Sequence, residues 1–481
     1  MLFWYHFDNK VTVKGKVCMK RTRVVMVVVA LVSSFTNGFS QTQLSLTLQQ
    51  SMEQALAHNP ELAVAENEFS KSRAGVWQAW STILPKLDGY ASLQHSWEIQ
   101  TSRIPNFLKP MLAPLGQTIP GVDKMPDFVD IAFGLENTLR YGATITQPIF
   151  LGGAGIAGIR LANAAERASD HSRQAGRQAL IFDVASAFYS VLFAQELVRV
   201  QENALAQAQA NLEVVSKKFD VGMASPLDKM RAQVDLANIE PELINARNGL
   251  QSALSNLRIV LGVDRTTTIE VRGGFQYEPD DLSAETLDEL QVLAIEHRHE
   301  VAMAHEQKEI ADYNITIARS NYFPRVIFQT DLSYLGMRDD LKFGRPDFSK
   351  GITSSFTLQI PIFSGFEYSK QAEKAELDFN SATENERQML NAINAEVEIA
   401  RNRFREAEEK YRSAMKTVEL GTEALRLANV MYEEGANTQL DVLTSQLALT
   451  RAQVNHVNAI FEYQIARYQL RKAIGTLNGV L

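Results

Sequence analysis

The sequence predicts a mainly α-helical fold with a transmembrane β-barrel portion, built from two tandem repeats of helix, β-hairpin, long helix and shorter helix. Three observations predict this fold. The 481-residue chain repeats itself, each copy contains two segments of alternating polarity, and each copy then continues for 70 residues without a proline. Because these patterns occur twice in the same order, we expect one structural plan used two times.

The internal repeat aligns residues 219–262 with 432–475 at a constant offset of 213 and without a gap. Upstream of the alternating segments the offset is 239, so the first copy holds 26 additional residues. They include a proline-rich stretch, 104–126, that predicts a long loop. We therefore divide the chain into a first repeat, an equatorial segment around the long helices and a second repeat, at residues 41–262, 263–298 and 299–481.

Two alternating segments in each repeat predict β-strands with one apolar and one polar face. The four predicted strands are about residues 86–100, 136–147, 325–337 and 351–360. Such alternation is typical of barrel strands that face lipid on one side and a lumen on the other. Four strands leave two unpaired edges that lipid does not tolerate, so this interpretation requires several copies of the chain. A soluble pair of hairpins is the alternative.

After each hairpin, residues 152–221 and 365–434 predict helices that would each extend roughly 105 Å. Apolar residues recur every seven positions in both copies, which is the spacing of a coiled coil. Gly222 and Gly435 mark the ends of the long helices, and the hydroxyl residue three positions after each glycine begins a shorter return helix. A coiled-coil rod would explain the helices, but it would leave the strands without a role.

The N-terminal segment predicts export from the cytoplasm. Residues 1–40 contain a basic stretch, a nine-residue apolar run and a small-residue end, which predict a secretory signal peptide with Met19 as the true start. The only cysteine, Cys18, precedes that start, so we expect no disulfide, no thiolate nucleophile and no lipid anchor. No later stretch reaches 18 consecutive apolar residues, and we therefore predict no transmembrane helix.

Charge and motif content argue against several function classes. The chain has 48 Lys and Arg against 56 Asp and Glu, and an acidic exported chain is a poor candidate for nucleic-acid binding. The glycines of 153–158 fit a dinucleotide motif, but a 70-residue helix follows them, so no cofactor is expected. His297, His299 and His305 do not share one helix face, so no metal is expected. No catalytic arrangement is visible, and we expect no enzyme.

The repeated turns carry a resemblance to a known family. The segments Phe219–Asp228 and Tyr432–Leu443, together with the order of elements, resemble the TolC-type outer-membrane efflux channels over about residues 45–478. The resemblance implies a homotrimer in the outer-membrane lipid, with twelve strands in one barrel and twelve helical columns in a periplasmic tunnel. It also implies that a periplasmic adaptor protein and an inner-membrane pump dock at the helix turns.

The same resemblance implies a gate at the periplasmic end. Tyr432 and Asp228 match residues that link the two helix pairs in the closed state, and Asp441 matches an aperture aspartate, so that three copies would form an acidic, cation-preferring ring. Gly222, Gly435, Leu227 and Leu440 belong to the turns that contact partners. Asn437, Leu227 and Thr444 depart from the family pattern, and their differences imply a looser gate with a thinner acidic ring. Capping of the return helices alone would also explain Asp228 and Asp441.

These observations lead to two functional hypotheses. The first is a passive outer-membrane exit duct of a tripartite export system, for drugs, metals or proteins. The second is a non-channel coiled-coil structural protein of the periplasm or cell surface. The second expects the apolar side chains of Leu93, Trp97, Tyr141 and Phe356 to meet protein rather than lipid.

Overall fold

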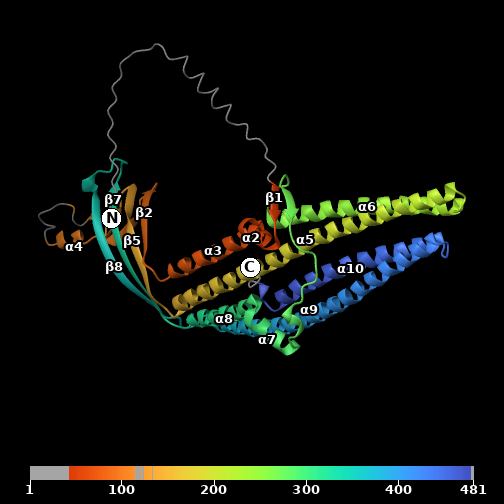
Figure 1. The fold of residues 1–481 in the computed structure, drawn as a ribbon. Coiled ribbons are helices and arrows are strands. Elements are labelled where there is room, and N and C mark those ends of the chain that lie inside the picture. Colours follow the sequence, from red (N-terminus) through yellow and green to blue (C-terminus); the bar gives the residue numbers. More distant parts are fainter. Residues whose placement is uncertain (1–42, 113, 115–120, 122–123, 133, 478–481) are drawn as a thin grey trace, which may run out of the picture.

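The structure is a computed structural model that describes residues 43–112, 114, 121, 124–132 and 134–477. The predicted signal peptide, residues 1–40, lies outside the described residues. The strands form a curved sheet at one end of the molecule, and the helices extend away from that sheet as a long bundle (Figure 1). The predicted mainly α-helical fold, with two repeats of a β-hairpin, a long helix and a shorter helix, is confirmed.

Four strands form one antiparallel sheet in the order β2-β5-β7-β8. They are β2 (Lys86–His95), β5 (Asn137–Leu151), β7 (Arg325–Arg338) and β8 (Phe348–Gln359). One hairpin comes from each repeat, and β5 and β7 join the two hairpins at the centre. The sheet therefore ends in two edges within the chain, β2 on one side and β8 on the other.

The two faces of this sheet differ in polarity, as the alternating pattern predicts. On one face, Thr144 lies opposite Asp331, and the hydroxyl groups of Tyr90 and Thr144 each donate to the Asp331 carboxylate at 2.9 Å. On the other face, apolar side chains such as Leu87 and Phe356 are 71% and 75% exposed. A polar lumen face and an apolar outer face are what a lipid-embedded barrel wall needs.

Two helical hairpins extend from the sheet. The first consists of α5 (Ala154–Asp220) and α6 (Pro226–Leu261), and the second of α9 (Glu367–Glu433) and α10 (Gln439–Ala473). Each long helix has 67 residues and extends roughly 100 Å. The long helices persist because neither contains a proline, and α6 continues through its internal Pro241.

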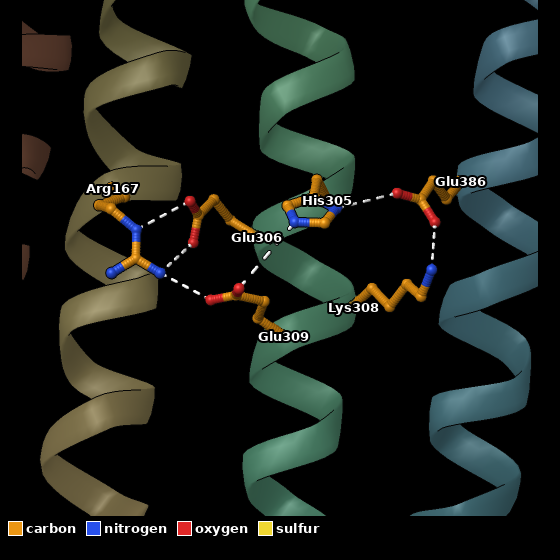
Figure 2. A network of polar contacts seen from close by, with 6 residues as sticks. All are labelled: Arg167, His305, Glu306, Lys308, Glu309 and Glu386. Carbon is orange, nitrogen blue, oxygen red and sulfur yellow. Dashed lines mark hydrogen bonds and ion pairs between the residues drawn. The ribbon is translucent and has the colours of Figure 1, made fainter.

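Shorter helices cover the half of the bundle next to the sheet. They are α2 (Leu48–His58), α3 (Pro60–Trp80), α7 (Leu287–His297) and α8 (His299–Ser320). The helix α8 lies between the two long helices (Figure 2). There Arg167 of α5 donates to Glu306 of α8 at 2.7 Å, and Lys308 of α8 donates to Glu386 of α9 at 2.8 Å (Figure 2). Neighbouring columns therefore follow the order α3, α5, α8, α9.

The equatorial segment closes two hydrophobic cores around the middle of the bundle. Its strand β6 (Thr268–Val271) pairs in parallel with β1 (Gln43–Leu46) beside the core that contains Phe188. Its 3₁₀ turn η3 (Asp281–Ser283) follows Asp280, which lies against α10. The Asp280 carboxylate accepts from two arginines of α10, Arg467 and Arg471, at 2.6 and 2.7 Å. The segment is thereby tied to the second hairpin.

The stretch after β2 differs from the prediction. We expected one strand over 86–100, but β2 ends at His95, and a separate hairpin of β3 (Thr101–Pro105) and β4 (Phe128–Ala132) follows. The helix α4 (Leu108–Leu112) lies inside the predicted proline-rich loop, and the 3₁₀ turn η4 (Arg345–Asp347) precedes β8. The alternating polarity continues past the end of β2 and so does not reveal this break. Alternation shows which face of a sheet a side chain occupies, but it does not show with which strand its own strand pairs.

Among the described residues, one helix, α5, includes a stretch that is long and apolar enough to cross a membrane by length and composition alone. Half of that stretch is buried inside the protein. The buried side chains Ile181, Val184 and Phe188 pack in the core closed by the equatorial segment. Packing within the bundle therefore accounts for the buried half of that stretch.

Candidate functional site

The two helix turns at the far end of the bundle share one backbone geometry. Gly222 and Gly435 have φ angles of 79° and 73°, in the left-handed region that favours glycine. After them, the Met223 N–H donates to the Lys218 carbonyl at 2.7 Å, and the Ala436 N–H donates to the Met431 carbonyl at 2.8 Å. These bonds form the glycine-terminated end that satisfies the last helical carbonyls, and both turns stop their helices abruptly.

Reciprocal capping boxes start both return helices. The Ser225 hydroxyl accepts from the Asp228 N–H at 3.1 Å, and the Asp228 carboxylate accepts from the Ser225 N–H at 3.2 Å. The Thr438 and Asp441 pair repeats this arrangement. Hydrogen bonds from Thr438 hold the pKa of the exposed Asp441 carboxyl below its usual range. Both aspartates therefore cap their helices, and both remain near the turn surface as acceptors.

Tyr432 connects the second hairpin to the first. The Lys218 ammonium of α5 lies 3.9 Å from the centre of the Tyr432 ring and donates to the Tyr432 carbonyl at 2.9 Å. Burial, and then the charge of Asp228, raise the pKa of the Tyr432 hydroxyl. In the described part of the chain, no hydrogen bond joins that hydroxyl to Asp228. Close to the turns, the polar contact between the hairpins is therefore made by Lys218, with Asp228 near it.

Sequence reasoning missed Lys218. The sequence indicates only that Lys218 lies in the last turn of α5, where the helix dipole stabilises a cation. Lys217 lies in the same turn, so the sequence does not distinguish the two lysines. The two lysines differ in their partners, because Lys217 pairs with Glu213 of its own helix at 2.6 Å. A second cation, Lys229 of α6, lies 4.9 Å from the Phe219 ring within the first hairpin. The inter-hairpin partner of Lys218 depends on how the helices pack.

Apolar side chains of the predicted turn surface are exposed at both tips. Leu227 and Leu440, at equivalent positions of the two repeats, are 51% and 52% exposed. Val221 and Met223 beside the first turn are also exposed. Thr444, where the resemblance implies an acidic residue, donates its hydroxyl to the Leu440 carbonyl of its own helix at 2.7 Å. The tips therefore combine exposed apolar groups with capped carboxylates.

The groove between the hairpins above the tips has both polar and apolar side chains in its lining. Its cavity of about 310 Å³ lies between α5 and the second hairpin and is lined in part by Gln207, Asn211, Asn429 and Gln446. The amide nitrogens of Asn211 and Gln446 are buried without a hydrogen-bond partner in the protein. A buried polar group without a partner costs free energy, so this contact is less favourable than an apolar one would be. The two unpaired amides therefore make this part of the contact between the hairpins less favourable.

The histidines considered from the sequence lie apart. His299 faces His171 of α5 with 3.4 Å between their Nδ1 atoms, and His305 lies 3.2 Å from Glu386 of α9. Among the described residues, no three His, Cys, Asp or Glu side chains converge as a metal-binding group. Gly153 of the dinucleotide-like stretch is the residue before α5, with a φ of 92°, and permits the turn from strand to helix.

The sequence model described as "Outer membrane efflux protein" matches residues 51–263 and 290–476. The chain belongs to this family. Outer membrane protein TolC of Vibrio cholerae is 24% identical over 349 residues, which cover 71% of this chain and 78% of that protein. Cobalt-zinc-cadmium resistance protein CzcC of Cupriavidus metallidurans is 28% identical over 343 residues, covering 69% of this chain and 76% of that protein.

Solved structures of this outer membrane efflux protein fold agree with the observed architecture. The Campylobacter jejuni CmeC outer membrane channel superposes with a TM-score of 0.72 at 19% identity, covering 89% of this chain and 85% of that chain. The open state of the Neisseria gonorrhoeae MtrE outer membrane channel superposes with a TM-score of 0.67 at 18% identity, covering 89% of each chain.

The family membership decides between the hypotheses at the level of function class. This efflux protein is an outer-membrane channel of Gram-negative bacteria that extends into the periplasm, and it is not an enzyme. The structural-rod alternative expected Leu93, Trp97, Tyr141 and Phe356 to meet protein. Leu93, Trp97 and Phe356 are 58%, 93% and 75% exposed in the chain, whereas Tyr141 is 38% exposed and stacks on Tyr334 of the same sheet. Those side chains belong to the apolar outer side of the sheet or to the segment just beyond it.

Proposed function

We propose that three copies of this efflux protein form a passive exit duct, gated at the helix turns and docked there on a periplasmic adaptor and an inner-membrane pump. The observation that carries this proposal is the open sheet, whose edges β2 and β8 both lack a partner within the described chain. Open edges are not tolerated in lipid, whereas three four-stranded sheets joined edge to edge give a closed twelve-stranded barrel.

The internal repeat supports the way in which the copies meet. Within one chain, α5 of the first repeat packs against α8 of the second. By the repeat, α9 is equivalent to α5 and α3 is equivalent to α8, so α9 of one copy would pack against α3 of the next. Gly152 fits this scheme, because a Cβ there would lie 2.4 Å from the Ser320 carbonyl oxygen. Its equivalent, Gly365, has nothing within 4 Å of a Cβ in its own chain and would meet the next copy.

The gate of the proposed duct is the contact between hairpins. Lys218 holds the end of α9 through Tyr432, while the unpaired amides in the groove above weaken the rest of the contact. The Lys218 interactions would have to break when the ends of the hairpins separate. Asp441 of each copy would stand at the narrow end, where three carboxylates favour cations.

The turns supply the docking surface of the proposed duct. Met223, Leu227 and Leu440 expose apolar area at the tips, where a periplasmic adaptor would approach the channel. An adaptor that buries these side chains would gain about 25 cal/mol for each square ångström of apolar surface that it removes from water. Contact at the tips would also act on the end of α9 that Lys218 holds.

Single-channel recording of the purified protein in a planar bilayer tests the proposal. Discrete cation-selective steps, whose selectivity falls in Asp441→Ala, would support both the duct and the acidic aperture. Steps with unchanged selectivity would keep the duct and remove Asp441 from the aperture. A folded protein that stays monomeric in detergent and gives no steps would contradict the trimeric duct.

A further inference from the structure

Two histidines face one another where the two repeats meet. His171 belongs to α5 of the first repeat, and His299 is the first residue of α8 of the second. Their Nδ1 atoms lie 3.4 Å apart, whereas their ring centres are 5.6 Å apart, so each ring turns its Nδ1 side toward the other. Two protonated rings would repel each other at this distance, and at least one of the rings is therefore neutral.

The separation of the two nitrogens matches the geometry of a shared metal ion. Zinc binds imidazole nitrogen at about 2.0–2.1 Å in a tetrahedral site, and this geometry places two such nitrogens about 3.3–3.4 Å apart. The observed separation of 3.4 Å agrees with that range. One ion can therefore bind both nitrogens after rotation of the rings alone. A hydrogen bond between the rings would give a similar distance, so the charges around the pair decide between the two.

These charges favour a cation. Asp170 precedes His171, and Arg298 and Glu300 flank His299. Two ion-pair groups result, and in each of them one arginine is shared by two carboxylates. Arg173 contacts Asp170 and Glu66, and Arg298 contacts Glu300 and Glu396. Four carboxylates against two arginines leave two negative charges. The positive charge of roughly half a unit at the start of α8 does not cancel them, whereas a divalent cation would.

The state of the two rings also suits a metal. Burial, and then the charge of His171, lower the pKa of His299, which favours its neutral form. The neutral form of imidazole keeps the lone pair with which it binds a metal ion. Both side chains are only partly buried, so water can reach the remaining positions around an ion. The nearby carboxylates stay with their arginines, and the protein supplies two ligands.

The equivalent contact between copies of the chain lacks this pair. By the internal repeat, His171 corresponds to Glu384 and His299 corresponds to Pro60. The proposed contact of α9 with α3 of the next copy would therefore hold no histidine at these two positions. The pair belongs to the contact of α5 with α8 inside one chain.

We propose that His171 and His299 together bind one divalent transition-metal ion of the zinc class, and that this ion fastens α5 to α8 within each chain. Imidazole nitrogens suit zinc, copper and nickel ions. The ion joins the first repeat to the second beside the equatorial segment, where the Gln178 amide of α5 also donates to the Gly475 carbonyl at 3.0 Å. The site lies within one chain, so the site and the proposed duct can each fail alone.

Isothermal titration calorimetry with zinc tests the site. The full chain is purified without a polyhistidine tag, treated with a chelator and titrated at neutral pH. We expect one zinc ion per chain, bound more than about 10-fold more weakly in His171→Ala and in His299→Ala, because loss of a residue that only supports a ligand already costs about 10–100-fold. His305→Ala is the matched control, since it removes a histidine of α8 that contacts Glu386 instead (Figure 2). A wild type that binds no zinc, equal affinities in the wild type and both variants, or loss of binding in the control would overturn the proposal.

A second measurement replaces one ligand with another. In a chain whose only native cysteine, Cys18, is replaced, His299→Cys keeps a metal ligand, whereas His299→Ser is similar in size and offers no thiolate. Cobalt is the probe, because a bond from thiolate to cobalt gives a charge-transfer band in the near-ultraviolet. We expect the band in His299→Cys, its loss when His171→Ala is added, and no band in His299→Ser. A folded His299→Cys chain without the band, or a band that His171→Ala leaves unchanged, would refute the shared site.

Discussion

Replacing Lys218 with methionine removes one positive charge while preserving the length of the side chain. The change deletes a cation–π contact of 3.9 Å and a hydrogen bond of 2.9 Å to the Tyr432 carbonyl. A cation–π contact contributes about 0.5–2 kcal/mol, and a charged hydrogen bond contributes about 1.5–3 kcal/mol when it is buried. Because Lys218 is only half-buried, we expect a loss of about 1–2 kcal/mol per chain, or roughly 5–30-fold in the equilibrium between joined and separated hairpins.

The assay is the open probability of single channels in planar bilayers without partner proteins. Lys218→Met should open more often than the wild type. The matched control is Lys217→Met, which removes the same charge from the adjacent residue, whose partner is Glu213 of the same helix. We expect that control to behave like the wild type, because its ion pair is exposed and joins no two helices.

Equal open probabilities for the two lysine variants would refute the reasoning. If both variants opened more often than the wild type, the increase would follow from net charge. In either case the contact with Tyr432 would have no role in closure. A double variant with Tyr432→Leu gives an independent check, because a shared contact makes the effects of the two substitutions less than additive.

Four further substitutions test other parts of the structure. Gly435→Ala should cost about 1–2 kcal/mol through the left-handed backbone alone, lowering the thermal midpoint, since its Cβ has open space. Phe404→Ala, in the core with Tyr463, should cost about 3–5 kcal/mol and lower the same midpoint further. Asp280→Asn should lower stability at neutral pH but less at acidic pH. Burial opposes the charge of Asp280, but hydrogen bonds from Arg467 and Arg471 hold the pKa of its carboxyl below the usual value. The stabilisation that the carboxylate provides is therefore lost as the pH falls through that lowered pKa. Thr438→Ala should raise the pKa of Asp441, so that cation selectivity disappears at a higher pH than in the wild type.

The sequence alone predicts the elements whose residue types follow a regular local pattern. The alternation of residues predicts the four long strands and their lumen and outer faces, and the absence of proline predicts the two 67-residue helices. The glycines at 222 and 435 predict both turns. These predictions are correct because each feature is specified by residues that are close together in the chain.

Features that depend on distant residues stay hidden from such patterns. Lys218 and Tyr432 are more than 200 residues apart, and no period relates them. The pairing of β1 with β6 and of His171 with His299 is set by how the helices pack. Asp228 shows the intermediate case, because its cap follows from the sequence, whereas its closeness to Tyr432 requires the fold.

The covalent link between the repeats has a consequence for assembly. In the proposed duct, six similar repeats surround one axis, but three of the six contacts between repeats, those of α5 with α8, are made inside single chains. A tether of this kind raises the effective concentration of its two partners to the millimolar range for short linkers. Barrel closure then requires the meeting of three molecules instead of six, which favours completion of the ring when each chain is scarce in the envelope.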